Sequence, residues 1–353
     1  MKKQNFYAVI LSGGSGERFW PLSTPARPKQ FLNVFGGKSL IRQAVDRVKG
    51  LIPPSQVIVV TAESLVKATR KELPEIPRAN IIVEPCRRDT AAAIATACGA
   101  VERLGGADAV AAVLTADHLM TDEKAFRQVL TDAVVAAQTT DNIVTMGVAP
   151  DYPATGFGYI QVGRPAKLGT KTVFHQAVRF VEKPDEKTAK RYLATKKYVW
   201  NAGMFVWRVA TMKAALLAKT PALAILEAAV ADRKNRIPVV LQSYYPQLPR
   251  ISIDYAVMEK STNILVSRGA FGWDDVGTWT AADRHLATDA RRNVAKGDVT
   301  LLDVVNTVAI SEKPHIAALG VKDIVIVATK DSVLVAAKDR VQDLKKLLAE
   351  MTK

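Results

Sequence analysis

The chain contains few of the residues that form disulfides or bind transition metals. Its 353 residues include two cysteines, Cys86 and Cys98, and four scattered histidines. Two cysteines make no disulfide framework in a chain of this size, and neither CxxC nor HExxH spacing occurs. The sequence therefore disfavours a zinc site, and we expect any metal to be a hard cation bound by carboxylates.

Long apolar runs are absent as well. Lys2 and Lys3 precede an apolar segment over residues 6–11, which is shorter than the roughly 7–15 residues of a signal-peptide core. No stretch approaches the ~18 uninterrupted apolar residues that cross a membrane. We therefore expect a cytoplasmic protein without a membrane partner.

The charge is strongly positive but dispersed. The net charge of +15 comes from 49 Lys and Arg against 34 Asp and Glu. Nucleic-acid binding is a common reason for such a charge, but no run of four basic residues and no aromatic-basic module is present. An anionic small-molecule substrate explains the charge as well, so we expect no nucleic-acid partner.

Short apolar runs alternate with helical patterns over the first 150 residues. We expect strands over 7–11, 57–61, 81–84, 110–115 and 143–148, and helices over 40–49, 63–73, 90–104 and 123–138. This alternation predicts an α/β fold with a mixed, mainly parallel sheet that helices cover on both faces. The loops after parallel strands meet at one edge, which would bring residues 13–18, 84–89 and Asp117 into one cleft.

The pattern changes twice further along the chain. Residues 156–270 are mixed α+β, with strands expected over 159–162, 173–181, 204–207 and 263–267. Several short strands rich in Val and Ile follow over 297–337, and then an amphipathic helix over 340–350. We predict a large catalytic domain over residues 1–288. A small β-rich C-terminal domain over 289–353 would serve packing or oligomer contacts, such as those of a homodimer.

The segment after the first expected strand has the composition of a phosphate-binding loop. Residues 11–29 read LSGGSGERFWPLSTPARPK, in which Leu11 is followed by Gly13, Gly14 and Gly16, and the loop carries Arg18 and Lys29. Glycines allow backbone N–H groups to turn toward an anion, and two cations on one loop suit a polyphosphate. On glycine content alone, an ordinary strand-to-helix turn is an equal alternative.

Two familiar phosphate motifs do not fit this loop. A Walker A loop needs GxxxxGK[ST], but Gly16 is followed by Glu17 and Arg18. The dinucleotide fingerprint GxGxxG needs a glycine where Phe19 stands, which disfavours a nicotinamide-dependent oxidoreductase.

The remaining pattern, GGxGxRxxPxS followed by PK, resembles the signature of the sugar-nucleotide pyrophosphorylases. The forms RFWPLS and RPKQF are similar to the mannose-1-phosphate guanylyltransferases in particular. The resemblance extends over about residues 5–337. It implies a Rossmann-like nucleotidyltransferase domain, a C-terminal domain with left-handed β-helical turns, and Mg²⁺ as cofactor. The implied reaction converts GTP and α-D-mannose 1-phosphate to GDP-mannose and pyrophosphate. From the chain length we expect the isomerase domain of longer, bifunctional relatives to be absent.

A second group of expected nucleotide-binding residues lies after the third strand. A carboxylate at Glu84 can accept hydrogen bonds from both donors on the guanine edge. Residues 84–94 resemble the family's EPxxRNTAPAI, which adds Arg88, Asp89 and Thr90 to the expected site, although Asp89 replaces asparagine and Ala92 replaces proline. The structural alternative is that Asp89 or Thr90 only caps the following helix.

Two carboxylates are candidates for the metal. Asp117 lies in LTADH, which resembles the family's LPADH with Thr115 in place of proline. Residues 271–279 match FGWxDVGxW, which selects Asp275 rather than Asp274. The resemblance implies that Asp117 and Asp275 share one Mg²⁺. A helix cap or a surface turn is the alternative for each.

Three short motifs resemble the family's sugar-binding segments. They are TGFGYI at 155–160, FxEKP at 180–184 and WNxGMF at 200–205. The residues they assign to the sugar phosphate are Gly156, Tyr159, Glu182, Lys183, Asn201 and Gly203. Each motif is weak alone, whereas their order and spacing are specific.

The implied chemistry requires charge neutralisation rather than a general base. The second pKa of a phosphate monoester is about 6, so the attacking oxygen is already an anion at neutral pH. By the resemblance, Arg18 contacts the β- and γ-phosphates, Lys29 the α-phosphate and Lys183 the sugar phosphate. Other sugar 1-phosphates or nucleoside triphosphates, and a catalytically silent sugar-nucleotide-sensing subunit, remain as alternatives. The presence of both Asp117 and Asp275 disfavours a silent subunit.

Overall fold

The structure is a computed structural model that describes residues 5–14 and 16–351. The chain forms two compact units, each assembled from three separate segments. Unit 1 comprises Met1–Gly13, Ala44–Ala116 and Met120–Trp273, and unit 2 comprises Gly14–Gln43, Asp117–Leu119 and Asp274–Lys353.

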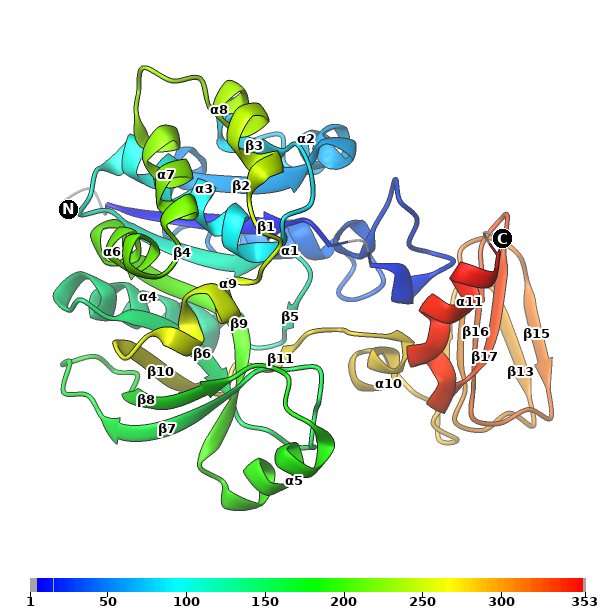
Figure 1. The fold of residues 1–353 in the computed structure, drawn as a ribbon. Coiled ribbons are helices and arrows are strands. Elements are labelled where there is room, and N and C mark those ends of the chain that lie inside the picture. The colour runs from blue at the N-terminus through cyan, green and yellow to red at the C-terminus, as the bar shows by residue number, and fades with distance from the viewer. Residues whose placement is uncertain (1–4, 15, 352–353) are drawn as a thin grey trace. The chain divides into compact units, whose positions relative to one another are not determined.

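Unit 1 is built on a nine-stranded mixed sheet with the order β3-β2-β1-β4-β9-β6-β10-β8-β7 (Figure 1). The strands are β1 (Phe6–Ser12), β2 (Val57–Ala62), β3 (Ile81–Glu84), β4 (Val110–Thr115), β6 (Ile143–Val148), β7 (Tyr159–Pro165), β8 (Phe174–Val181), β9 (Tyr198–Arg208) and β10 (Ile264–Gly269). Strands β8 and β9 run opposite to the other seven. The expected α/β fold with a mixed, mainly parallel sheet is confirmed.

The interior strands are apolar because helices cover both faces of the sheet. Residues 6–10 of β1 are all buried, as expected for a strand without a solvent face. The alanine-rich helix α3 (Asp89–Gly105) contacts β1, β2 and β4, and α4 (Glu123–Thr139) contacts β4, β6, β9 and β10. A Cβ at Gly99 of α3 would lie 2.4 Å from the carbonyl oxygen of Glu227, so α3 packs closely on α7 (Pro221–Ala231).

The other helices are shorter. They are α1 (Leu40–Asp46), α2 (Val66–Glu72), α5 (Glu186–Thr195), α6 (Val209–Lys219), α8 (Ile237–Tyr244), α9 (Ile253–Ala256), α10 (Ala282–His285) and α11 (Leu344–Met351), and two short strands are β5 (Leu119–Met120) and β11 (Trp273–Asp274). Among the described residues, none of the helices is long and apolar enough to cross a bilayer.

The C-terminal part of unit 2 is a coil of short parallel strands. They are β12 (Val294–Lys296), β13 (Val299–Leu302), β14 (Val308–Ser311), β15 (Ile316–Leu319) and β16 (Ile324–Ala328), and β17 (Val333–Ala337) closes the sheet. The pairs β12–β14, β14–β16 and β13–β15 are parallel, and β16–β17 is antiparallel. Parallel pairing of strands so close in sequence is the pattern of a β-helix, which confirms the expected C-terminal β-rich architecture.

Unit 2 has its own core, which residues from its first and last segments share. Phe19, Leu32 and Phe35 belong to the same buried cluster as Val308 and Val325. Phe19 meets Trp279 with ring centroids 4.9 Å apart, and the Trp279 indole N–H donates to the carbonyl oxygen of Trp20 at 3.0 Å. The glycine-rich loop therefore rests on a core that the C-terminal strands help to build.

Candidate active site

The glycine-rich loop folds back on Lys29. Gly16 has φ of 62°, and a Cβ there would lie 2.4 Å from the backbone nitrogen of Lys29. Only glycine meets both conditions. The Ser23 hydroxyl donates to the Gly16 carbonyl oxygen at 2.6 Å, and the Gln30 amide donates to that of Gly14 at 3.3 Å. These contacts fix where Lys29 starts its short 3-10 turn, Lys29–Phe31.

The buried Lys29 ammonium joins two motifs that are far apart in sequence. Its Nζ lies 3.0 Å from Asp117 Oδ2 and donates a further hydrogen bond to the backbone carbonyl of Asp275. Arg18, by contrast, is exposed and has no ion-pair partner among the residues that the structure describes. All four residues predicted to act on phosphate and metal belong to unit 2.

Lys29 and the neighbouring carboxylates shift the pKa values of Asp117 and Asp275. Burial would raise the pKa of Asp117, but Lys29 and His118 hold the pKa of this carboxyl below its ordinary value. The pKa of Asp275 is raised, first by burial and then by the neighbouring carboxylates of Asp274 and Asp117, against the effect of Lys29. Two carboxylates that repel each other and have a shared cation nearby are suited to a divalent ion.

Asp274 and Asp275 have different environments. The Asp274 carboxylate accepts hydrogen bonds from Arg284 at 2.6 and 3.0 Å, from the Val276 N–H at 2.7 Å, and lies 2.7 Å from His285 Nε2. Despite burial, these donors hold the pKa of Asp274 far below its usual range. Within the described part of the chain, no group donates a hydrogen bond to the Asp275 carboxylate. Asp274 is thus engaged within the protein, and Asp275 is the carboxylate open to a ligand.

The donor set at this point is small. Among the described residues, no group of three or more His, Cys, Asp and Glu side chains could hold a metal ion. Asp117 and Asp275 alone fit a hard cation that takes its remaining ligands from phosphate oxygens and water. That Asp117 and Asp275 bind the same Mg²⁺ stays a prediction.

In unit 1, Glu84 stands at the end of β3 and is paired with a residue that the sequence did not suggest. The buried Tyr245 hydroxyl donates a hydrogen bond to Glu84 Oε1, and Oε2 lies 3.4 Å from the position of a Cβ at Gly13. The pKa of Glu84 is raised by burial, which the Tyr245 hydrogen bond opposes. Leu11, near the end of β1, accepts a hydrogen bond at its carbonyl oxygen from the Ala116 N–H at 3.1 Å.

Arg88, Asp89 and Thr90 already have protein partners. The Arg88 guanidinium donates to the carbonyl oxygens of Tyr245, at 3.2 Å, and of Pro246. The Thr90 hydroxyl accepts the N–H of Ile253 at 2.9 Å. Asp89 has φ of 64°, a conformation that Asn and Asp tolerate best after glycine, and its side chain accepts the Thr90 N–H at 2.8 Å. These residues position the end of β3 and the start of α3.

The expected sugar motifs meet in a second cluster of unit 1. Lys183 Nζ lies 3.0 Å from Glu182 Oε1, and the Glu182 N–H donates to Glu259 Oε1 at 2.8 Å. A Cβ at Gly158 would lie 2.5 Å from Glu182 Oε2, so the backbone of the TGFGYI segment closely approaches the Glu182 carboxylate. Gly156, in the same segment, is exposed and has open space around it.

Asp254 is a member of this cluster that sequence reasoning missed. Its Oδ1 accepts a hydrogen bond from Asn201 Nδ2 at 3.0 Å, while Asn201 Oδ1 accepts from the Thr145 hydroxyl at 3.2 Å and the Gly203 N–H at 3.1 Å. Burial, and then Glu182, raises the pKa of Asp254 to about 7. The N-cap residue Ser252 was a local signal of a helix start, but nothing in sequence connected Asp254 with Asn201.

Tyr159, one of the expected sugar-site residues, is buried in the structure. The Tyr159 side chain is fully buried, and its ring packs against Tyr192 with centroids 5.5 Å apart. It belongs to a core cluster with Trp200 and Ala189. The structure thus shows a packing contact for Tyr159, and its assignment to the sugar-phosphate site stays a prediction.

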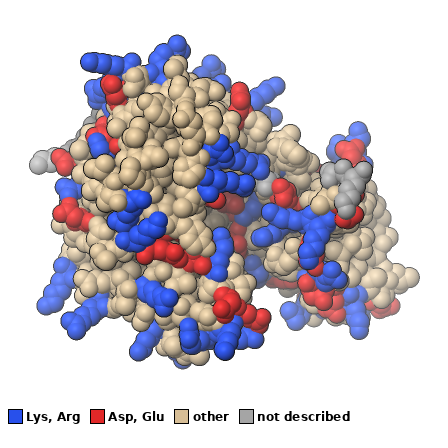
Figure 2. All heavy atoms as spheres, viewed as in Figure 1, with Lys and Arg blue, Asp and Glu red and all other residues tan. Residues whose placement is uncertain are grey.

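Two further expectations concern the surface charge and a common cleft. Figure 2 shows lysines and arginines spread over the visible face with acidic side chains among them, in keeping with the dispersed basic residues of the sequence. The expectation that residues 13–18, 84–89 and Asp117 line one cleft stays a prediction, because these residues are divided between the two units.

Comparison with known proteins identifies the family. Residues 7–291 match the Nucleotidyl transferase family, and residues 297–351 match the MannoseP isomerase/GMP-like beta-helix domain. Mannose-1-phosphate guanylyltransferase of Escherichia coli K12 is 36% identical over 99% of this chain and 74% of its own length. Xanthan biosynthesis protein XanB of Xanthomonas campestris pv. campestris B100 is 38% identical over 97% of this chain and 72% of its own length.

A solved structure is similar over the whole fold. The crystal structure of mannose-1-phosphate geranyltransferase from Thermus thermophilus has a TM-score of 0.89 and 32% identity, covering 99% of this chain and 100% of the other. With the motifs, the two matched domains and these relatives taken together, the chain belongs to the mannose-1-phosphate guanylyltransferase family of nucleotidyl transferases.

Proposed function

We propose that this protein transfers a guanylyl group from GTP to α-D-mannose 1-phosphate, forming GDP-mannose and pyrophosphate. The observation that carries the proposal is the buried Lys29 ammonium, which contacts both the Asp117 carboxylate and the Asp275 backbone. A fixed cation beside two carboxylates, with the exposed Arg18 on the same unit, suits the polyphosphate chemistry of the family.

In this reaction a sugar-phosphate oxygen forms a bond to the α-phosphorus of GTP. The bond from that phosphorus to the bridging oxygen breaks, and the electron pair leaves with pyrophosphate. The attacking oxygen is an anion at neutral pH, since its second pKa is about 6, so no side chain needs to remove a proton. The protein has to align the two phosphates and offset their repulsion, which we assign to Arg18 at the β- and γ-phosphates and Lys29 at the α-phosphate.

We assign the metal to Asp117 and Asp275. When bound, Mg²⁺ would supply charge neutralisation on the phosphates. Asp275 suits this role because its carboxylate has no hydrogen-bond donor among the described residues, whereas that of Asp274 is held by Arg284 and His285.

Recognition of the two substrates falls to unit 1. We assign the guanine edge to Glu84, whose orientation the Tyr245 hydroxyl supports. We assign the sugar hydroxyls to Glu182 and to Asp254, which Asn201 orients, and the sugar phosphate to Lys183. A hydroxyl group both donates and accepts, so a protonated and an ionised carboxyl together offer more ways to bind it than two carboxylates do.

The test is pyrophosphate release measured with four nucleoside triphosphates, each combined with mannose, glucose and other hexose 1-phosphates. GTP with mannose 1-phosphate is expected to have the highest kcat/KM. A higher kcat/KM for another pair would mean that this other pair is the substrate. Nucleotide binding without turnover of any pair would favour a sensing subunit.

A further inference from the structure

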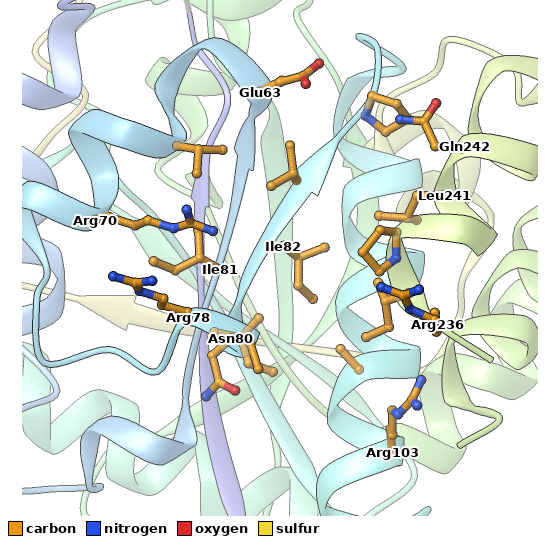
Figure 3. A pocket seen from close by; sticks show the side chains of 18 of the residues that line it. Glu63, Arg70, Arg78, Asn80, Ile81, Ile82, Arg103, Arg236, Leu241 and Gln242 are labelled. Atoms are coloured by element: carbon orange, nitrogen blue, oxygen red, sulfur yellow. The ribbon is translucent and has the colours of Figure 1, made fainter. Parts of the chain in front are cut away.

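Unit 1 contains a cavity of about 820 Å³, and none of the predicted site residues lines it. It lies along β3, the edge strand of the sheet, with α2 on one side and α3 and α8 on the other (Figure 3). This volume is within the range of roughly 300–1,000 Å³ that small-molecule sites occupy.

The floor of the cavity is aliphatic. Ile58, Ile82 and Leu241 are buried side chains that line it, and none of its lining residues is aromatic. A nucleobase or another flat ring would therefore find no stacking partner. An aliphatic chain, in contrast, would bury apolar surface over its whole length on such a floor.

The rim of the cavity carries positive charge. Arg70 and Arg78 lie on one side of the floor and Arg236 on the other, as Figure 3 shows. Among the described residues, none of these three guanidinium groups has an ion-pair or hydrogen-bond partner. A fourth arginine, Arg103, donates to the carbonyl oxygens of Val230, Arg233 and Asn235 and so is held in place. The only carboxylate in the lining is Glu63.

An aliphatic floor with uncompensated guanidinium groups on both sides selects for one kind of molecule. Arginine pairs with phosphate and carboxylate through parallel N–H donors. We propose that the cavity along β3 binds an amphipathic anion, a phosphate or carboxylate head on an aliphatic chain, and that its occupancy weakens GTP binding through the Glu84–Tyr245 pair.

Two of the elements that line the cavity, β3 and α8, lead to the two members of that pair. Strand β3 contributes Ile81, Ile82 and Val83 to the lining and ends at Glu84. Helix α8 contributes Leu241 and Gln242 and leads into Tyr245. A ligand between these elements would bias their separation, and with it the hydrogen bond from Tyr245 to Glu84. This coupling rests on the proposed role of Glu84 in GTP binding, while the ligand site itself does not.

The first experiment measures binding of octyl phosphate and ethyl phosphate to the full chain by isothermal titration calorimetry. Octyl phosphate is expected to bind at least ~10-fold more tightly than ethyl phosphate, because its extra methylene groups are buried. The double variant Arg70→Gln/Arg236→Gln should weaken octyl phosphate binding at least ~10-fold. The matched control Arg164→Gln, at an exposed arginine of β7, should leave it unchanged.

Three results would overturn the site. They are no binding of octyl phosphate, equal binding by wild type and the double variant, and loss of binding in Arg18→Ala, which would put the anion in the nucleotide site instead.

The second experiment measures the Kd of GTP with and without saturating octyl phosphate. We expect octyl phosphate to raise this Kd about 3- to 10-fold in wild type, a typical size for coupling between two sites. The effect should disappear in Arg70→Gln/Arg236→Gln and in Tyr245→Phe. An unchanged Kd in wild type would overturn the coupling, whereas failure of GTP to bind at all would contradict the proposed function and leave the ligand site standing.

Discussion

The two units each place a lysine beside two carboxyl groups, but the electrostatics of the two clusters differ. In unit 2 the Lys29 side chain is only 10% exposed, and the pKa of its partner Asp117 is lowered. In unit 1 the Lys183 side chain is 57% exposed, while the pKa of nearby Asp254 is raised to about 7. In the first cluster the buried Lys29 lowers the pKa of Asp117, whereas in the second burial of Asp254 itself, and then Glu182, raises the pKa of Asp254 to near neutral pH.

This difference suits the two proposed tasks. When a polyphosphate reacts, negative charge develops on the departing pyrophosphate in the transition state. Its site therefore needs fixed positive charge. A sugar presents neutral hydroxyls that donate and accept, so carboxyl groups of variable protonation can serve it. The predictions below test the contrast, from the largest expected effect to the smallest.

Removing a fixed cation should have the largest effect. Lys29→Ala and Arg18→Ala are each expected to lower kcat by at least ~100-fold, because each removes preorganised positive charge from the transition state. Turnover is measured by pyrophosphate release, with circular dichroism to establish that the variants are folded. Arg27→Ala is a matched control on the same loop, since Arg27 pairs with Glu312 instead. Wild-type rates in folded Lys29→Ala or Arg18→Ala would contradict the phosphate-loop assignment.

The metal prediction separates two adjacent aspartates. EDTA should abolish activity and Mg²⁺ should restore it. Asp117→Asn and Asp275→Asn should raise the Mg²⁺ concentration for half-maximal rate and lower the maximum rate, while Asp274→Asn should do much less. A Mg²⁺ titration of all three variants checks this. A greater defect in Asp274→Asn than in Asp275→Asn would mean that the wrong carboxylate has been assigned.

Base selectivity should depend on a single buried carboxylate in unit 1. An unpaired buried acceptor or donor costs about 1–3 kcal/mol, so kcat/KM for GTP should exceed that for ATP by roughly tenfold to a hundredfold. Glu84→Gln should reduce this ratio, because an amide offers one acceptor to two guanine donors. The ratio is measured by nucleotide competition, and equal values for GTP and ATP in wild type would rule out the role of Glu84.

The protonation contrast should also affect stability. Because the pKa of Asp254 is raised on folding, the native state holds a proton that the unfolded chain has released between about pH 4 and 7. Asp254 therefore contributes a loss of stability as pH rises through this window, and Asp254→Asn removes that contribution. We expect the urea midpoint of wild type to fall more between pH 5 and pH 8 than that of Asp254→Asn. The exposed control Asp151→Asn should follow wild type, and parallel behaviour of all three proteins would refute the raised pKa.

Local patterns predicted the strands of the sheet well, while the phosphate-binding role of residues 11–29 stays a prediction. Residues 57–61 and 110–115 were expected strands, and they lie in β2 and β4. Short apolar runs that alternate with helical patterns are typical of buried strands in an α/β fold. The choice of Asp275 over Asp274 came from resemblance alone. The structure adds a physical reason, since Asp274 is engaged by Arg284, His285 and a backbone N–H.

Long-range partners could not be predicted. The hydrogen bonds from Tyr245 to Glu84 and from Asn201 to Asp254 join residues 161 and 53 positions apart, and no local pattern encodes them. The predicted boundary between residues 288 and 289 assumed contiguous domains. In the structure residues 14–43 belong to the same compact unit as the C-terminal strands, because Phe19 and Leu32 share a core with Val308.

That shared core has a consequence for how the protein is made. The glycine-rich loop over residues 11–29 is synthesised well before β14 and β16, which begin at Val308 and Ile324. Domains generally fold during synthesis from the N-terminus onward. Here Phe19 packs with Val308 and Val325, which are translated much later. The nascent chain can form most of its sheet before the core under the glycine-rich loop is complete, so we expect activity to arise only once the C-terminal strands have been made.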